Sequence, residues 1–123
     1  MSNAEVEFSI LAGSGAPVRT FKQGEIIFRE GDPASELYVI KSGRVDISTG
    51  NRLLATLDDK GIFGEMALID KTPRSATVTA ATDVELVPVN EKQFLFLVSQ
   101  TPFFALKVMR VLAGRLRIAN KAI

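Results

Sequence analysis

The sequence contains no cysteine, no histidine and no tryptophan. Without cysteine, the chain cannot form disulfide bonds, iron–sulfur clusters or a thiol nucleophile. Without histidine, it also lacks the commonest general base and the commonest metal ligand of proteins. Carboxylate sites for Mg²⁺ or Ca²⁺ remain chemically open, but there is no aspartate-rich loop of the calcium-binding type. We therefore predict that the protein is not an enzyme and holds neither a metal ion nor a cofactor.

The sequence also lacks long apolar runs and a strong excess of charge of either sign. No run approaches the 18 or more residues that a membrane span needs, and no secretory leader is visible at the start. The formal net charge is +1, so no overall field favours nucleic acid or membranes. We expect a cytoplasmic protein without a membrane span. Residues 1–4 resemble the remnant of an expression tag, in which case the native chain can extend beyond either end.

What is present fits a single domain over residues 1–123, because 46% of the residues are hydrophobic and 24% are charged. Glycines separate short stretches that are rich in β-branched and aromatic residues. We predict strands at Val18–Phe21, Glu25–Phe28, Leu37–Ile40, Val45–Ile47, Leu53–Leu57, Ser75–Ala80 and Val84–Val89. Short strands with turn signals between them predict an all-β sandwich or barrel over residues 18–89, followed by helices over 90–123. A further helix is expected at Val6–Leu11.

Helical signals dominate the C-terminal third of the chain. Asn90 is a favoured N-cap and Gln93 completes a capping box, which predicts a helix over Glu91–Ser99. Thr101–Pro102 is a typical start for a second helix, with a capping hydroxyl and proline at the first helical position. The following segment, Phe103–Asn120, contains no proline and one glycine, so we predict the longest helix of the chain there.

One face of this long helix carries small and apolar residues at alternating steps of four and three. The set is Ala105, Met109, Leu112, Leu116, Ala119 and Ile123. This heptad spacing predicts a homodimer through the 103–123 helix or packing of the face against the β-barrel, and the two are compatible.

The charges of the C-terminal third are one-sided, because no acidic residue follows Glu91. The basic residues are Lys92, Lys107, Arg110, Arg115, Arg117 and Lys121. They indicate either a solvated helix face or contact with an anionic ligand or an acidic partner. No aromatic residues interleave with these charges and the chain has no DNA-binding motif, so nucleic acid is a poor fit.

The stretch over residues 63–78 carries the most chemical information. Gly64 permits a backbone conformation, or a close approach, that a side chain would block. Glu65–Ile69 is long enough for one or two helical turns, and Pro73 prevents the helix from continuing. A short helix behind a glycine presents backbone N–H groups that favour an anion. Arg74 on the returning strand is placed to meet the same anion, because a guanidinium matches a phosphate with two parallel hydrogen bonds.

Glu65 is unusual beside a site for an anion, which its carboxylate would repel. Its presence indicates a ligand with a hydroxyl donor near the phosphate, such as a sugar hydroxyl. Taken singly, Glu65 could merely favour a helix N-terminus, and Arg74 could form a surface salt bridge with Asp70 or Glu65. The ordered string, and not either residue alone, argues for a ligand.

A closely similar pattern is found in the phosphate-binding cassette of cyclic-nucleotide-binding domains. The matching string is Phe63-Gly64-Glu65-Met66-Ala67-Leu68, a short turn, and Pro73-Arg74-Ser75-Ala76-Thr77-Val78. Two earlier stretches, Gly24–Asp32 and Leu37–Val45, resemble the family's first hairpin and its next strand–turn–strand unit. The resemblance covers roughly Val18–Asn120. It implies a mainly β fold, an eight-stranded and jelly-roll-like β-roll that forms a double-stranded barrel with C-terminal helices. The ligand would be held inside the roll.

The resemblance also implies a set of ligand-binding residues, each by its position in the motif. They are Gly64, Glu65, Met66, Ala67, Arg74, Ser75 and Ala76. Glu65 would bond the ribose 2′-hydroxyl and Arg74 would pair with the cyclic phosphate. The glycine and the two residues after the glutamate would line the phosphate with backbone groups. Ser75 would add a hydroxyl to the phosphate or the base edge, and the following alanine a backbone N–H.

Contacts outside the motif are inferred from alternation and from the family's architecture. Val39, Leu53 and Val78 are candidates for the inner face of the roll, where they would contact sugar and base. The long helix would cap the base, with Leu112, Arg115 and Leu116 as candidate contacts.

The implied function is a ligand sensor in which cAMP or cGMP favours a closed state, capped by the C-terminal helix, that relays the signal. We favour cAMP as the common bacterial-type ligand, since Ser75 is less diagnostic than the threonine associated with cGMP. The chain would be a stand-alone sensor or a fragment of a larger regulator. The alternatives are a degenerate domain used for oligomerisation, the sensor half of a transcription regulator, and a small cupin-type enzyme, which the missing histidines disfavour.

Overall fold

The computed structural model describes residues 17–59 and 61–121, with side chains described as far as Gly114 apart from residue 60. The helix predicted at Val6–Leu11 and the residues that resemble a tag remnant lie outside this part of the chain. So does Ile123 of the heptad seam, and the side chains of Leu116 and Ala119 are also not described.

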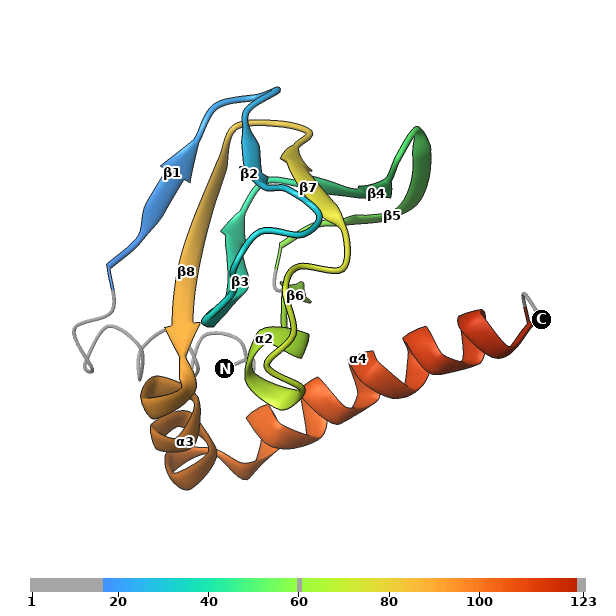
Figure 1. The fold of residues 1–123 in the computed structure, drawn as a ribbon. Helices are drawn as coiled ribbons and strands as arrows, with labels where there is room; N and C mark the ends of the chain where they lie inside the picture. The colour runs from blue at the N-terminus through green and yellow to red at the C-terminus, as the bar shows by residue number, and fades with distance from the viewer. Residues whose placement is uncertain (1–16, 60, 122–123) are drawn as a thin grey trace.

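Two four-stranded antiparallel sheets form the body of the protein (Figure 1). The first sheet has the order β1 (Arg19–Phe21), β8 (Val84–Asn90), β3 (Glu36–Ser42), β6 (Ile62–Phe63). The second has the order β2 (Ile26–Phe28), β7 (Thr77–Ala80), β4 (Val45–Thr49), β5 (Arg52–Leu57). This is the β-roll that the sequence implied. All the predicted strands are present, with ends shifted by at most two residues, and β6 is the strand that was not identified individually.

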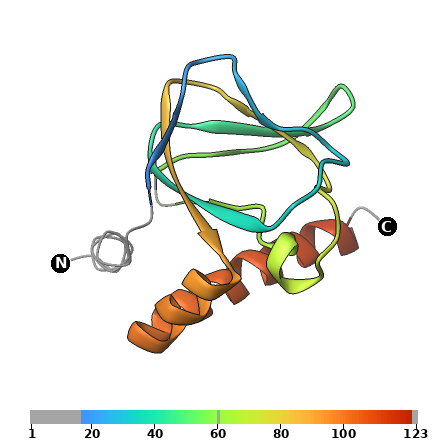
Figure 2. The ribbon, with the colours of Figure 1, turned by 60° about the vertical axis from the view of Figure 1, so that its left-hand side comes forward.

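Three helices lie within the described residues: α2 (Met66–Ile69), α3 (Glu91–Gln100) and α4 (Pro102–Lys121). The capping box of α3 is confirmed, because Asn90 Oδ1 accepts from Gln93 N and Gln93 Oε1 accepts from Asn90 N, both at 2.9 Å. Figures 1 and 2 show α3 and α4 together at one end of the roll, joined at a sharp bend. The bend follows from Thr101, whose extended backbone ends α3 just before Pro102 begins α4.

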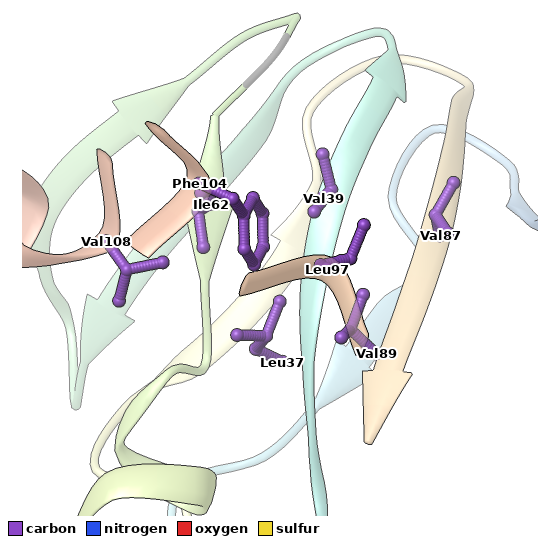
Figure 3. Packing of buried hydrophobic residues seen from close by; sticks show 8 residues of the cluster. All are labelled: Leu37, Val39, Ile62, Val87, Val89, Leu97, Phe104 and Val108. Carbon is purple, nitrogen blue, oxygen red and sulfur yellow. The ribbon is translucent and has the colours of Figure 1, made fainter. Parts of the chain in front are cut away.

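Two hydrophobic cores result, one on each side of the sheet that contains β3. Between the two sheets lie Tyr38, Ile40, Val45, Phe63, Val78, Ala80, Val84 and Leu86. Between that sheet and the helices lie Leu37, Val39, Ile62, Val87, Val89, Leu97, Phe104 and Val108 (Figure 3). Because side chains alternate along a strand, β3 supplies both cores. The helices therefore cover the outer face of this sheet and leave the interior of the roll to the strands.

This arrangement corrects one expectation. Val39 was placed on the inner face of the roll, but it is buried among the residues of the helix-facing core (Figure 3). Its neighbours Tyr38 and Ile40 point between the sheets instead.

The heptad face of α4 is divided between two environments. Leu112 is partly buried against the helix-facing core, as expected for a face that packs on the roll. Met109 is 57% exposed.

Among the described residues no single helix is long and apolar enough to cross a membrane, and only the bent pair of α3 with residues 102–114 meets that test by length and composition.

Candidate functional site

A cavity of about 550 Å³ lies between the second sheet and the segment that follows β6. All of the site residues predicted from the sequence line it: Gly64, Glu65, Met66, Ala67, Arg74, Ser75 and Ala76. The remaining lining residues are Phe28, Ile47, Arg52, Leu53, Leu54, Ala55, Phe63, Thr72, Pro73 and Val78. The volume is within the usual range for small-molecule sites, about 300–1,000 Å³, and the walls are mainly apolar with a few polar groups, as in such sites.

Gly64 fixes the geometry where β6 leads into α2. Its φ is +78°, a conformation that side chains other than glycine's rarely adopt. A Cβ on this residue would lie 2.7 Å from Arg74 Nη1, too close for any real contact. The backbone conformation therefore favours glycine here, and a side chain at this position would displace the guanidinium of Arg74.

Arg74 enters the cavity from the segment between α2 and β7, and not from a strand as expected, because β7 begins only at Thr77. Its backbone is tied to the loop after β2, because Gly31 N donates to Arg74 O at 2.7 Å and Arg74 N donates to Asp32 O at 2.9 Å. The residue is only 7% exposed, so it is buried and not the surface residue weighed from the sequence. Its Nη1 donates to Gly64 O at 3.2 Å, while Nε is buried without a hydrogen-bond partner.

The guanidinium of Arg74 lies against aromatic rings. Its Cζ atom is 4.0 Å from the ring centroid of Phe28 and 5.6 Å from that of Tyr38. Burial lowers the pKa of Arg74, and interactions with Tyr38, Glu36 and Asp32 act in the opposite direction. The group stays cationic at neutral pH. It therefore presents donors and a positive charge to an anion in the cavity.

Glu65 places a carboxylate beside the same cavity. The residue is 1% exposed and occupies the N-cap position of α2, where its side chain makes no capping hydrogen bond. Of the neighbouring cassette residues, Ala67 and Ala76 are buried and Ser75 is exposed. A cation and a carboxylate on one apolar cavity fit a ligand that carries both an anionic group and a hydroxyl donor.

The inner wall of the cavity comes from the strands of the second sheet. Leu53 and Val78 were expected there and do line it, whereas Val39 does not. The alternation that predicted Leu53 did not predict Leu54. The register between β4 and β5 shifts, with Ile47 opposite Ala55 and Ser48 opposite Leu53, so Leu54 is the extra residue of a bulge. Consecutive residues of β5 therefore reach the same cavity.

Phe28 is the cavity residue beside Arg74 that sequence analysis missed most clearly. It lies at the end of β2, far in the chain from the cassette, and faces Arg74 only because β2 pairs with β7. Thr72 and Pro73 were assigned only to the turn, and they also line the cavity. The alternation of Ile26 and Phe28 was the one signal available, and it indicates a face but not a partner.

The helix α4 contributes no residue to the cavity among those whose side chains are described. Leu112 contacts the helix-facing core, and the side chains of Arg115 and Leu116 are outside the description. A cap over the base by this helix stays a prediction. No group of three or more acidic side chains that could hold a metal ion occurs in the described part of the chain.

Comparison with known proteins agrees with the geometry. The profile of the cyclic nucleotide-binding domain family matches residues 18–101. The chain is 36% identical over 107 residues to the cyclic AMP receptor protein of Thermus thermophilus, covering 83% of this chain and 50% of that protein. The crystal structure of the catabolite activator protein of Thermus thermophilus superposes with a TM-score of 0.80 at 34% identity, covering 98% of this chain and 57% of that one. The chain belongs to the cyclic nucleotide-binding domain family.

A second solved protein bears on the ligand. The EAL enzyme Bd1971 in its cAMP-bound form has a TM-score of 0.63 at 42% identity, covering 85% of this chain and 29% of that one. Its cGMP-bound form has a TM-score of 0.64 at 40% identity, covering 86% and 30%. In both comparisons the similarity is confined to part of a longer protein, and the chain spans about half the length of the curated relative described above.

Proposed function

We propose that this chain is a regulatory sensor that binds a cyclic nucleotide, cAMP in preference to cGMP, and does not itself catalyse a reaction. The observation that carries the proposal is Arg74, a buried cation whose guanidinium faces a cavity of about 550 Å³. Glu65, buried on the same cavity, supplies an acceptor for the ribose 2′-hydroxyl. One ligand class, a phosphate joined to a ribose, satisfies both groups.

The preference for cAMP rests on similarity and not on a contact. The receptor protein from Thermus thermophilus is named for cyclic AMP and shares more than a third of its residues with this chain over the matched region. The solved EAL enzyme was obtained with either cAMP or cGMP, so the fold accommodates both bases. Ser75 lines the cavity next to Arg74, and in this proposal its hydroxyl bonds the phosphate or the base edge.

The signal would leave the site through α4. In this proposal the nucleotide favours a state in which α4 caps the base, and the helix then passes the change to a partner or to a second copy of the chain. A ligand can shift such an equilibrium only by its difference in affinity for the two states. The match covers 50% of the receptor protein from Thermus thermophilus. This supports an alternative form of the proposal, in which the chain is the sensor part of a longer regulator.

Calorimetric titration of cAMP and of cGMP into the wild type and Arg74→Ala tests the proposal. We expect binding by the wild type, tighter for cAMP, and an affinity at least about tenfold weaker in the variant, because a charge-assisted hydrogen bond contributes about 1.5–3 kcal/mol. Arg44→Ala is the matched control, since Arg44 is exposed and does not line the cavity.

The outcomes separate the candidates. Equal loss in Arg74→Ala and Arg44→Ala would contradict the assigned site. No heat and no thermal shift with either nucleotide would contradict the sensor function and favour a degenerate domain that serves as an oligomerisation scaffold. A ligand at 100 times its dissociation constant should raise the free energy of unfolding by about 2.7 kcal/mol, so a thermal shift is a sensitive second readout.

A further inference from the structure

Arg74 is a buried cation without an acidic counter-ion in the part of the chain that the structure describes. The ion pairs found there are Arg19–Glu36 and Lys71–Glu91. The two carboxylates whose charges act on Arg74 are engaged elsewhere. Asp32 Oδ2 accepts from Arg29 N at 2.9 Å, and Glu36 Oε1 accepts from Arg19 and from Tyr38. A desolvated charge is costly unless something compensates it, so the groups in contact with this guanidinium bear on its stability.

The ring of Phe28 lies against this guanidinium. The guanidinium carbon lies 4.0 Å from the Phe28 ring centroid, well inside the distance of about 6 Å at which a cation interacts with a ring face. Tyr38 is a more distant second ring, at 5.6 Å. Nη1 of the guanidinium also donates to Gly64 O at 3.2 Å.

The Phe28 ring is itself held in place from three directions. Its backbone pairs with Val78 of β7, and its ring centroid lies 6.1 Å from that of Tyr38 and 5.9 Å from that of Phe63. Tyr38 is anchored in turn, because its hydroxyl donates to Glu36 Oε1 at 2.9 Å and accepts from Arg19 Nη1 at 3.0 Å. These contacts hold the Phe28 ring in the position in which it meets Arg74.

The chemical difference between a ring and a carboxylate matters at an anion site. A carboxylate under Arg74 would neutralise the guanidinium and repel an incoming phosphate. The ring quadrupole stabilises the cation without carrying a net charge. We propose that Phe28 is the positioning residue for phosphate recognition. Its ring holds the guanidinium of Arg74 in the cavity without neutralising it, so the positive charge remains available to bind the cyclic phosphate. This inference rests on the proposed function.

Fluorinated phenylalanines at position 28 test the inference directly. Adding fluorine atoms weakens the quadrupole of the ring and changes its shape little, so a packing role predicts a flat series. We expect the affinity for cAMP, measured by calorimetry, to fall steadily along the series, by about tenfold at full fluorination. Urea unfolding of each variant reports whether the fold is intact.

A double-mutant cycle gives an independent readout. Phe28→Leu should weaken cAMP binding by about tenfold in the wild type and have no further effect in Arg74→Ala, because Phe28 acts through the arginine. Phe28→Tyr, which keeps the ring, should restore most of the affinity. Phe21→Leu is the matched control, since Phe21 packs on the same inner core but does not line the cavity.

The outcomes distinguish this inference from the function on which it rests. Binding by the wild type with a flat fluorine series, or additive losses in the cycle, would overturn the role of Phe28 alone. Absence of nucleotide binding by the wild type would overturn the proposed function and this inference with it.

Discussion

Burial of Arg74 costs the fold the hydration of a charged group and provides a cation for binding an anion. Burying a guanidinium removes its hydration, which is why burial lowers its pKa. One carbonyl and two ring faces compensate only part of that loss. A phosphate in the cavity would supply the missing acceptors and the missing opposite charge. The buried guanidinium, with Nε lacking a hydrogen-bond partner, is thus suited to bind an anion.

Gly64 provides the first prediction at this scale. Replacing it with alanine places a methyl group 2.7 Å from Arg74 Nη1 in a backbone conformation of φ +78°. We expect a loss of about 1–2 kcal/mol in the free energy of unfolding from the backbone. Displacement of the guanidinium should in addition weaken cAMP binding by about tenfold or more. Urea denaturation and calorimetry measure the two effects separately.

Gly24→Ala is the matched control for this prediction. Gly24 has a φ of +89°, but nothing lies within 4 Å of the position that its Cβ would take. The control should lose similar stability and keep its affinity for the nucleotide. If both variants lost affinity equally, strain in the roll, and not contact with Arg74, would explain the result.

Tyr38 gives a prediction about pH. Burial raises the pKa of its phenol above the ordinary value of 10.0, and the hydrogen bond to Glu36 adds to the shift. The unfolded chain therefore loses this proton at a lower pH than the folded chain. The stability that Tyr38 contributes is fully present below pH 10 and is lost as the pH rises through the folded pKa.

The measurement is clean because Tyr38 is the single tyrosine and the chain has no tryptophan. Tyrosinate absorbance in the near ultraviolet then reports this phenol alone. Its midpoint in the folded protein should lie above that of the urea-unfolded protein, and Tyr38→Phe should flatten the fall of stability above pH 10. A folded midpoint at or below the unfolded one would contradict the burial and the bond to Glu36.

The site was predictable from sequence to the extent that it is local. The cassette runs without interruption from Phe63 to Val78, so its glycine, carboxylate and guanidinium could be recognised together, and all of them line one cavity. Phe28 could not be recognised, because its contact with Arg74 depends on the pairing of β2 with β7. A residue whose role comes from a distant pairing has no signature in its own neighbourhood.

At the scale of elements, local chemistry determined the ends of helices and most of the strands. The capping box at Asn90 and the proline at position 102 set the starts of α3 and α4 as predicted. The strand β6 escaped identification because it has two residues, Ile62 and Phe63, between two glycines. Val39 was misplaced for a different reason. Four successive residues of β3 are buried, so alternation separates its two faces but cannot say which face is the inside of the roll.

The helix α4 is the element whose proposed movement can be followed. If it caps the base, saturating cAMP should slow hydrogen exchange of the α4 backbone beyond Leu112 by about tenfold or more, since capping must suppress local opening there. Hydrogen exchange of strand β1, at the edge of the first sheet, should change less. Mass-spectrometric exchange with and without cAMP measures this, and Arg74→Ala is the control without ligand. Protection confined to the cavity residues would show that α4 is not the cap.

At the scale of the whole molecule, the apolar residues of helices α3 and α4 fall into a buried group and an exposed group. Those facing the roll, such as Phe104 and Val108, are buried in the helix-facing core. Others remain exposed, among them Leu95, Phe103, Leu106 and Met109. Met109 shares the heptad seam with Leu112, which contacts the core, so the seam is divided between the roll and the outside. The sequence left packing and dimerisation open; among the seam residues whose side chains are described, Leu112 packs on the roll and Met109 is exposed.

The exposed seam residue, Met109, predicts a homodimer through α4. Met109 is 57% exposed on the seam, and burying it against a second copy would stabilise a dimer, so Met109→Glu should abolish the dimer by forcing a carboxylate into the interface. Light scattering after size exclusion should give twice the chain mass of 13.4 kDa for the wild type and the monomer mass for the variant. Leu95→Glu is the matched control, since Leu95 is 60% exposed on α3 and lies outside the seam.

A monomeric wild type would contradict the dimer, and dissociation caused equally by Leu95→Glu would place the interface on α3. If α4 serves both as cap and as dimer contact, cAMP should also shift the dimer dissociation constant, because one helix then links the two equilibria.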